Sequence, residues 1–307
     1  MIITVTLNPA YDKTYVVDDF EKGETNIAQS ITIITSGKGV NVSRILLEFG
    51  IENIAIGISD KEFLSALKLE GINENFVITD TPTRTNNKIV DSKQKITTEL
   101  NESGQPVSNE SLNLVQKCLE KHLKKDAIVI FSGSLPPGAP DDIYKQWIDI
   151  CHSKNATTIL DTSGSALLEG LKAVPYMVKP NLRELEFFAG KKLNTVSEIS
   201  AAAFEMSQLG IKKVMVSMGS KGAILVSDGK AYFGRAPKIA AKSTVGAGDA
   251  MVTACVYTMH KSMSLSNKDM LAMAIAAGSA SAKTDRHFDK SHVMELKNKI
   301  EITQLGC

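Results

Sequence analysis

Short apolar runs rich in β-branched residues alternate with longer amphipathic stretches, most clearly between residues 127 and 226. The pattern predicts strands over residues 127–132, 157–161, 176–179 and 214–217, and helices over residues 141–153 and 182–189. Repeated strand–helix units imply a parallel sheet with helices on both faces. Such a sheet binds ligands at the carboxyl ends of its strands, so the loops after strands are the first candidates for a site.

Two regions break this alternation. Residues 13–17 and 31–35 are strand-like with no helix between them, and residues 85–100 have the pattern of a polar hairpin with a turn at Asp91-Ser92-Lys93. We expect a small antiparallel lid formed by the discontinuous segments 11–18, 30–36 and 85–100. Because the sequence contains no internal repeat and no long linker, residues 1–307 are expected to form a single α/β domain that carries this lid.

Charge and composition exclude several classes of partner. The chain has 35 Lys and Arg against 34 Asp and Glu, which gives a formal net charge of +1. Since no overall positive field would hold nucleic acid or an anionic membrane, an anionic partner must be small and bound locally. The opening MIITVTLNPA lacks the features of a signal peptide, and no stretch reaches about 18 apolar residues. We therefore expect a cytoplasmic protein with neither a nucleic-acid nor a membrane partner.

The cysteines give no sign of a disulfide or a metal site. Cys118, Cys151, Cys255 and Cys307 are widely spaced, with no CxxC pair and no histidine at the spacing of a zinc ligand. Free cysteine packs as a small apolar residue. We expect all four to be reduced, buried thiols.

The densest chemical signal is the segment STVGAGD at residues 243–249, which precedes a small, apolar run that ends at Tyr257. Gly246 and Gly248 permit a tight turn, and the run predicts a buried helix whose first N–H groups lack intrahelical partners. Those groups suit a transferring phosphoryl group, and Asp249 could accept the proton of an attacking hydroxyl. An ordinary junction between a loop and a helix is the alternative interpretation. Walker A, Rossmann, nucleophile-elbow and zincin motifs do not occur in the sequence.

Four further segments stand in a characteristic order, namely TLNPAYD at residues 6–12, SGKGVNVSR at 36–44, SGSLPPG at 132–138 and KPNLRE at 179–184. Together with STVGAGDAM at 243–251, they resemble the motifs of the PfkB family of carbohydrate kinases, and the match extends from residue 3 to about residue 285. The opening is similar to that of the branch acting on phosphorylated ketohexoses. The resemblance implies a ribokinase-like three-layer α/β/α fold with a mainly parallel sheet and a β lid, and it implies ATP and Mg²⁺ as cofactors.

The resemblance also implies roles for individual residues. Asp249 is the expected catalytic base, and the backbone N–H groups of Gly246, Ala247 and Gly248 are expected to stabilise the phosphoryl group in transfer. Sugar-phosphate ligands are expected at Asp12, Gly37, Lys38, Gly39, Asn41 and Arg84, of which Lys38 and Arg84 would hold the phosphate. ATP ligands are expected at Lys179, Asn181, Ser217, Gly219, Gly222, Ala277 and Gly278. Glu184 is expected to hold Mg²⁺, directly or through water.

Most of these residues also have a purely structural interpretation. Lys38 and Arg84 could be solvated cations at turns, and Asn181 with Glu184 could form a helix capping box. Gly219 and Gly222 could belong to an ordinary turn. The small residues Ala277 and Gly278 could serve close helix packing rather than an adenine ring.

Two departures from the family pattern concern the sugar. Residues 58–62 (ISDKE) stand where sugar-phosphate members have a longer glycine-rich stretch, so a sugar-contacting loop is expected to be short. Pro137 stands where many 1-phosphofructokinases and tagatose-6-phosphate kinases have lysine. Both changes bear on the choice of sugar and leave the kinase assignment intact.

The resemblance therefore implies ATP-dependent phosphorylation of a ketohexose monophosphate, foremost fructose 1-phosphate, which would give fructose 1,6-bisphosphate. The alternative is a tagatose-6-phosphate kinase, and a non-catalytic regulator that binds sugar or nucleotide is a more distant one. A lid with free strand edges would be covered by a second copy, so a homodimer through the lid is expected. The sequence leaves open whether a monovalent cation supports the loop before Gly246.

Overall fold

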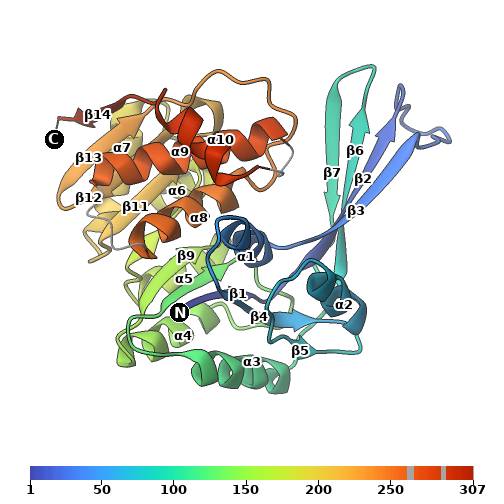
Figure 1. The fold of residues 1–307 in the computed structure, drawn as a ribbon, viewed down its shortest axis with the longest axis horizontal. Coiled ribbons are helices and arrows are strands. Elements are labelled where there is room, and N and C mark those ends of the chain that lie inside the picture. Colours follow the sequence, from blue (N-terminus) through green and yellow to red (C-terminus); the bar gives the residue numbers. More distant parts are fainter. Residues whose placement is uncertain (261–265, 285–287, 307) are drawn as a thin grey trace.

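The computed structural model describes residues 1–260, 266–284 and 288–306, and within these residues a sheet of ten strands forms the body of the molecule (Figure 1). The strand order is β14-β13-β12-β11-β10-β9-β8-β1-β4-β5, and every pair from β5 to β11 is parallel. The three strands after β11 are antiparallel. The bounds are β1 (Ile2–Thr6), β4 (Ile54–Ser59), β5 (Val77–Ile78), β8 (Ile128–Ser132), β9 (Thr157–Asp161), β10 (Met177–Val178), β11 (Lys213–Ser217), β12 (Ala223–Ser227), β13 (Lys230–Gly234) and β14 (Ile302–Leu305).

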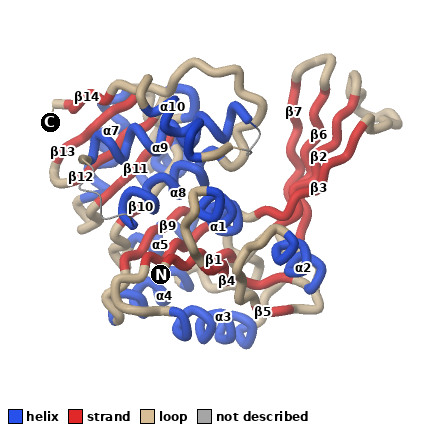
Figure 2. Tube along the Cα trace, in the orientation of Figure 1, coloured by secondary structure: helices blue, strands red, loops and turns tan. Residues whose placement is uncertain are grey.

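Helices cover both faces of this sheet, as the alternating pattern predicts (Figure 2). One apolar core packs against α3 (Asn109–His122), α4 (Ile143–Ser153), α5 (Gly164–Leu171), α6 (Leu182–Ala189) and α7 (Val196–Ser207). The other core packs against α1 (Lys38–Glu48), α8 (Ala247–His260), α9 (Asn267–Thr284) and α10 (Lys290–Lys297). A smaller cluster joins α1 and β4 to α2 (Lys61–Leu69). The expected three-layer α/β/α architecture is confirmed.

A second sheet projects from the body and is called the lid sheet below (Figure 1). It consists of β3 (Ser30–Ser36), β2 (Ala10–Val17), β6 (Arg84–Asp91) and β7 (Ile96–Asn101), in that order. The expectation of an antiparallel lid is wrong for one pair, because β2 and β6 run parallel. Between β2 and β6 the chain returns to the body through α1, β4 and α2. Both strands therefore enter the lid sheet from the body and run in the same direction.

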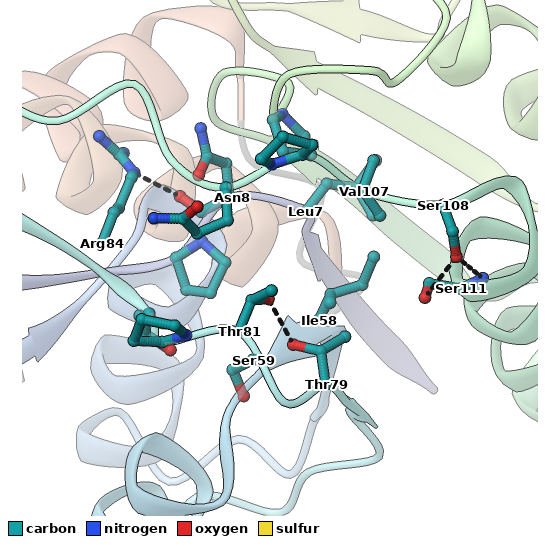
Figure 3. A pocket seen from close by; sticks show the side chains of 16 residues that line it. Leu7, Asn8, Ile58, Ser59, Thr79, Thr81, Arg84, Val107, Ser108 and Ser111 are labelled. Carbon is teal, nitrogen blue, oxygen red and sulfur yellow. Dashed lines mark hydrogen bonds between the residues drawn. The ribbon is translucent and has the colours of Figure 1, made fainter.

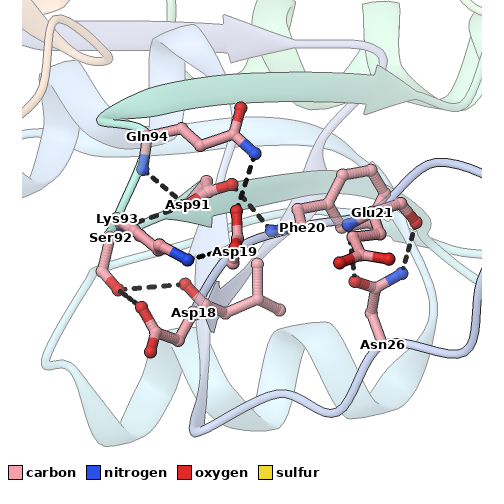
Figure 4. Close-up of polar contacts among 10 residues, drawn as sticks. Asp18, Asp19, Phe20, Glu21, Asn26, Asp91, Ser92, Lys93 and Gln94 are labelled. Carbon is pink, nitrogen blue, oxygen red and sulfur yellow. Dashed lines mark hydrogen bonds and ion pairs between the residues drawn. The ribbon is translucent and has the colours of Figure 1, made fainter.

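Polar contacts hold together the far end of the lid sheet (Figure 4). The carboxylate of Asp91 accepts the backbone N–H groups of Lys93 and Gln94 within the predicted turn and that of Phe20 in the connection after β2. The Lys93 ammonium group pairs with Asp19 in the same connection. The turn between β6 and β7 is therefore joined to the connection after β2 at this end of the lid sheet.

The cysteines differ in burial. Cys151 and Cys255 are buried, as expected, but Cys118 is only partly buried because α3 turns one side to solvent; all three are free thiols. Cys307 lies outside the described residues. Within the described part of the chain, no helix has the length and apolar character needed to cross a membrane.

Candidate active site

A pocket of about 620 Å³ lies between the lid sheet and the carboxyl ends of the central strands. From the lid sheet it is lined mainly by alternate residues of each strand, such as Asp12, Arg84 and Lys88, with Asn87 of β6 as an addition. The predicted site residues that line it are Asp12, Gly37, Lys38, Asn41, Arg84, Lys179, Asn181, Ser217, Gly246, Gly248 and Asp249. The fold thus brings together residues from every motif that suggested a kinase, apart from the SGSLPPG loop.

The remaining predicted site residues do not line this pocket, and close packing accounts for several of them. A Cβ at Gly39 would lie 2.3 Å from Oγ1 of Thr6, so this glycine lets α1 approach β1. A Cβ at Gly278 would lie 3.2 Å from the carbonyl oxygen of Ala247, so this glycine lets α9 approach α8. The predicted site residues outside the lining are Gly39, Glu184, Gly219, Gly222, Ala247, Ala277 and Gly278.

Asp249 is the buried carboxylate of the pocket. It stands in the first turn of α8 and is 5% exposed. Nδ2 of Asn41 donates a hydrogen bond to its Oδ2 atom at 2.7 Å. Burial raises the pKa of Asp249; Asp161 adds to this effect, whereas the Lys38 ammonium, the Asn41 amide and Lys179 oppose it. A carboxylate with a raised pKa is a better proton acceptor than an ordinary one, so Asp249 is suited to act as a general base.

A second buried carboxylate, Asp161 at the end of β9, belongs to none of the sequence motifs. Its Oδ1 atom accepts from Nζ of Lys38 at 2.9 Å and lies 3.3 Å from Nζ of Lys179. Burial raises the pKa of Asp161, but Lys179 and Lys38 outweigh this effect and hold it below the usual range. The position at the carboxyl end of a predicted parallel strand was the one signal that could have found it.

This ion pair fixes the position and the charge of Lys38, the residue that the motifs assign to the substrate phosphate. The side chain is 36% exposed and reaches the pocket, while its ammonium group is anchored on Asp161. Burial lowers the pKa of Lys38, but the carboxylates of Asp161, Glu184 and Asp249 together raise it by more, so the net shift is upward. Lys38 is therefore a permanently charged cation in a fixed place.

Arg84 stands where the pocket meets a smaller cavity of about 230 Å³ (Figure 3). Its guanidinium donates to the carbonyl oxygen of Asn8 at 3.3 Å, to that of Glu102 at 2.8 Å and to Oδ1 of Asn86 at 2.9 Å. Asn86 in turn donates to Oδ1 of Asp12 at 2.9 Å. Arg84 is therefore an oriented side chain rather than a solvated one. The shortened segment of the chain contributes Ile58 and Ser59 to the smaller cavity.

Lys88 is a second site residue outside the sequence motifs. It lies four residues after Arg84 along β6, on the face that lines the pocket. Its Nζ atom donates to Oγ of Ser243 at 3.1 Å, across the pocket from the lid sheet to the loop that precedes α8. Its place on the same face of the predicted hairpin as Arg84 could have identified it.

The nucleotide-side motifs form local structures. Asn181 and Glu184 make a capping box at the start of α6, in which Oδ1 of Asn181 accepts from Glu184 N and Oε2 of Glu184 accepts from Asn181 N. This confirms the structural interpretation of that pair. Gly222 has φ 106°, and a Cβ there would lie 1.9 Å from the carbonyl oxygen of Gly234, so the turn after β11 requires glycine.

A buried carboxylate at a helix N-terminus, with cations around it and a lid sheet opposite, suits a phosphotransferase whose acceptor is a hydroxyl group. Comparison with known proteins agrees, because residues 5–286 match the family described as pfkB family carbohydrate kinase. The chain belongs to this family of sugar kinases and has its ribokinase-like fold.

Individual relatives are similar over nearly the whole chain. The chain is 33% identical to the 1-phosphofructokinase of Haemophilus influenzae, over 99% of this chain and 98% of the relative. It is 32% identical to the 1-phosphofructokinase of Escherichia coli, over 98% and 97%. Phosphofructokinase-2 from Escherichia coli, solved in complex with substrates and products, has a TM-score of 0.91 at 26% identity and covers 97% of this chain and 98% of its own. The same relative has been solved with potassium and as a tetrameric inhibited form.

Proposed function

We propose that this protein transfers the γ-phosphoryl group of ATP to O6 of fructose 1-phosphate and so forms fructose 1,6-bisphosphate. The observation that carries the proposal is the buried carboxylate of Asp249 in the first turn of α8, in a pocket lined by cationic side chains. The cations favour a sugar that already carries a phosphate group. Two relatives named as 1-phosphofructokinases support this sugar phosphate over others. Because its reactants are ATP and a sugar phosphate, we expect the enzyme to act in the cytoplasm.

In the proposed reaction the carboxylate of Asp249 accepts the proton of the sugar hydroxyl. The hydroxyl oxygen bonds to the γ-phosphorus, the bond from that phosphorus to its bridging oxygen breaks, and ADP leaves with the electron pair. The N–H groups of Gly246, Ala247 and Gly248 lie where helix amides lack intrahelical partners, and they would stabilise the negative charge in transfer. Asp249 then releases the proton to solvent as the product leaves.

The cations have separate tasks in this proposal. The pocket is lined by Lys38, Arg84, Lys88, Lys179 and Lys242. We assign the phosphate of the sugar to Arg84 and Lys38, and its hydroxyl groups to Asp12 and Asn41. Lys88, which contacts the loop before α8, would stand near the phosphoryl group in transfer. Lys179 and Asn181, which follow β10, and Ser217, the last residue of β11, also line the pocket and would hold the nucleotide.

Magnesium would enter with the nucleotide. Mg²⁺ keeps several water ligands and is held by phosphates with one or two carboxylates. In residues 1–260, 266–284 and 288–306, no group of three or more His, Cys, Asp or Glu side chains could hold a metal ion. Glu184 could hold the hydrated ion through a water molecule. The capping box uses one of its carboxylate oxygens, and the other would accept a hydrogen bond from a water of the ion. The ion would neutralise phosphate charge.

The sugar is tested with a substrate panel on the purified protein. Fructose 1-phosphate, tagatose 6-phosphate, fructose 6-phosphate and fructose are compared by kcat/KM from ADP release, with and without potassium salts. We expect fructose 1-phosphate to lead by at least about tenfold. A higher value for tagatose 6-phosphate would move the assignment to the alternative. If saturating sugar phosphate produced no ADP, the protein would be a regulator.

We further propose that two copies associate through the outer face of the lid sheet, which is the face turned away from the pocket. The inner face supplies the pocket lining, so the alternating residues of each strand face outward. They include Ile31, Ile33, Ile96 and Leu100, each more than half exposed. An apolar face of this kind favours association with a matching surface, and a second copy supplies one.

The mass in solution tests this association. At micromolar concentration we expect a dimer, and Ile33→Asp should shift it to a folded monomer. Leu209→Asp, at an exposed apolar position outside the lid sheet, should leave the dimer intact. A monomeric wild type would refute the dimer and leave the kinase proposal standing.

A further inference from the structure

Arg44 connects the base of the lid sheet to the catalytic carboxylate through a single intermediate side chain. It lies on α1, one turn after Asn41, and its side chain is 21% exposed. Nη1 donates to Oδ1 of Asn41 at 2.9 Å, and Nη2 donates to the carbonyl oxygen and Oγ1 of Thr35 at 2.8 Å each. Nε donates to Oε2 of Glu70 at 2.8 Å. Each nitrogen of the guanidinium therefore has an acceptor, and its plane is fixed.

Asn41 is oriented from both ends of its amide. Its oxygen accepts from Arg44, and its nitrogen donates to Oδ2 of Asp249 at 2.7 Å and more weakly to Oγ of Ser36 at 3.5 Å. An amide that accepts from a cation at its oxygen becomes a stronger donor at its nitrogen. The cation also opposes a flip of the amide, which would place its oxygen against the carboxylate.

We propose that Arg44 is a positioning residue that holds the amide of Asn41 as a hydrogen-bond donor to the catalytic base Asp249. This inference rests on the proposed function, because it takes Asp249 as the base. Arg44 itself acts through Asn41 and is not expected to touch substrate. Thr35 belongs to β3 of the lid sheet and Glu70 follows α2, so the orientation of the base depends on the place where the lid sheet joins the body.

The effect on the base has a defined sign. Lys38 on α1, Lys179 after β10 and Asp161 at the end of β9 are the other charged groups that act on Asp249. They remain when Arg44 is replaced, whereas the hydrogen bond from Asn41 weakens. Since that bond favours the ionised carboxylate, its loss moves the pKa of Asp249 further upward. The base then needs a higher pH to be ionised.

The test is the pH profile of kcat for Arg44→Met. We expect kcat at pH 7 to fall about tenfold and the acid limb of the profile to move up by about one pH unit. The KM for the sugar phosphate should rise by less than kcat falls, because Asp12, Lys38 and Arg84 still line the pocket. Arg44→Lys, which can still donate to Asn41, should recover part of both effects. Lys68→Met removes an exposed cation that pairs with Glu74 and makes a matched control with an unchanged profile.

A double variant distinguishes positioning from a general loss of positive charge. If Arg44 acts through Asn41, adding Arg44→Met to Asn41→Ala changes kcat and its pH profile no further. Additive effects, or an equal loss of kcat at every pH, would overturn the proposal. If Arg44→Met folds poorly, Glu70→Gln releases one anchor of the guanidinium and should give a smaller shift in the same direction.

An independent readout separates this proposal from failure of the proposed function. The difference in melting temperature between wild type and Asp249→Asn depends on the ionisation of Asp249 and needs no turnover. If Arg44 has the assigned role, this difference begins to shrink at a higher pH in the Arg44→Met background than in the wild-type background. If the wild type shows no kinase activity but this shift occurs, the function fails and the positioning role stands. If the shift is absent, the positioning role fails.

Discussion

Two carboxylates are buried at the same edge of the central sheet, and their surroundings give them opposite properties. Asp161 at the end of β9 is held by the ammonium groups of Lys38 and Lys179, and together these outweigh the effect of burial and lower its pKa. Asp249 at the start of α8 has an amide donor, Asn41, and its pKa is raised with burial as the largest cause. The difference indicates that burial with paired cations makes an anchor, whereas burial without a direct ion pair leaves a carboxylate suited to the role of base that we propose for Asp249.

The largest effect is expected from removing the base. Asp249→Asn keeps the shape and removes the proton acceptor, so kcat should fall by about 10³- to 10⁴-fold with little change in the KM of the sugar phosphate. Steady-state kinetics measure both constants. Asp149→Asn, at an exposed position of α4, is the matched control and should change neither. Turnover near the wild-type rate would mean that Asp249 is not the base.

The next effect concerns the anchor. Asp161→Asn leaves the ammonium groups of Lys38 and Lys179 buried or half-buried without their anion, so we expect a loss of about 3–5 kcal/mol in the free energy of unfolding. Thermal unfolding should show a fall of roughly 10 °C in melting temperature. A change within about 0.5 kcal/mol, like that expected for an exposed position, would contradict the role of an anchor.

The third prediction reverses the sign of the second. An ionised carboxylate with a raised pKa destabilises the folded state, so Asp249→Asn should be about 1 kcal/mol more stable than the wild type at neutral pH. As the pH falls below the pKa of Asp249, the folded wild type takes up a proton and the difference shrinks; it is nearly gone at about pH 4, where the carboxyl group is also protonated in the unfolded chain. Unfolding experiments from pH 8 to pH 4 follow this change. A loss of stability in Asp249→Asn at pH 8 would remove the contrast between the two residues.

The elements of the body could be predicted because each carries its own periodicity. The helix over residues 182–189 and the strand over residues 157–161 match α6 and β9, and the buried helix predicted from the apolar run that ends at Tyr257 is α8, which begins at Ala247. The parallel pairing of β2 with β6 could not be predicted, since it depends on where the chain reenters the lid sheet. Local pattern fixes the type of an element but not the direction of a neighbour that is distant in sequence.

The site could be predicted only as far as motifs reach. Asp249 and Lys38 carry motif signals, but the pairing of Lys38 with Asp161 joins residues 123 positions apart and leaves no local trace. The motifs predict that Gly39 and Gly278 contact ligands, and in the structure these glycines also lie close against β1 and α8. A glycine permits close approach of any atoms, so sequence alone does not distinguish a ligand from a neighbouring element.

The smallest effect is expected at Gly248, which precedes Asp249 and lies close to Lys179. A Cβ at Gly248 would lie 3.3 Å from Nζ of Lys179, so Gly248→Ala displaces a flexible ammonium group that pairs with Asp161. Because alanine favours a helix, we expect the free energy of unfolding to stay within about 0.5 kcal/mol, while the KM for ATP rises about threefold to tenfold. Ser197→Ala, in the exposed first turn of α7, controls for the helix itself. If the KM of the sugar phosphate rose instead, Lys179 would bind the sugar phosphate rather than ATP, and the group that anchors Asp161 would also take part in binding the acceptor.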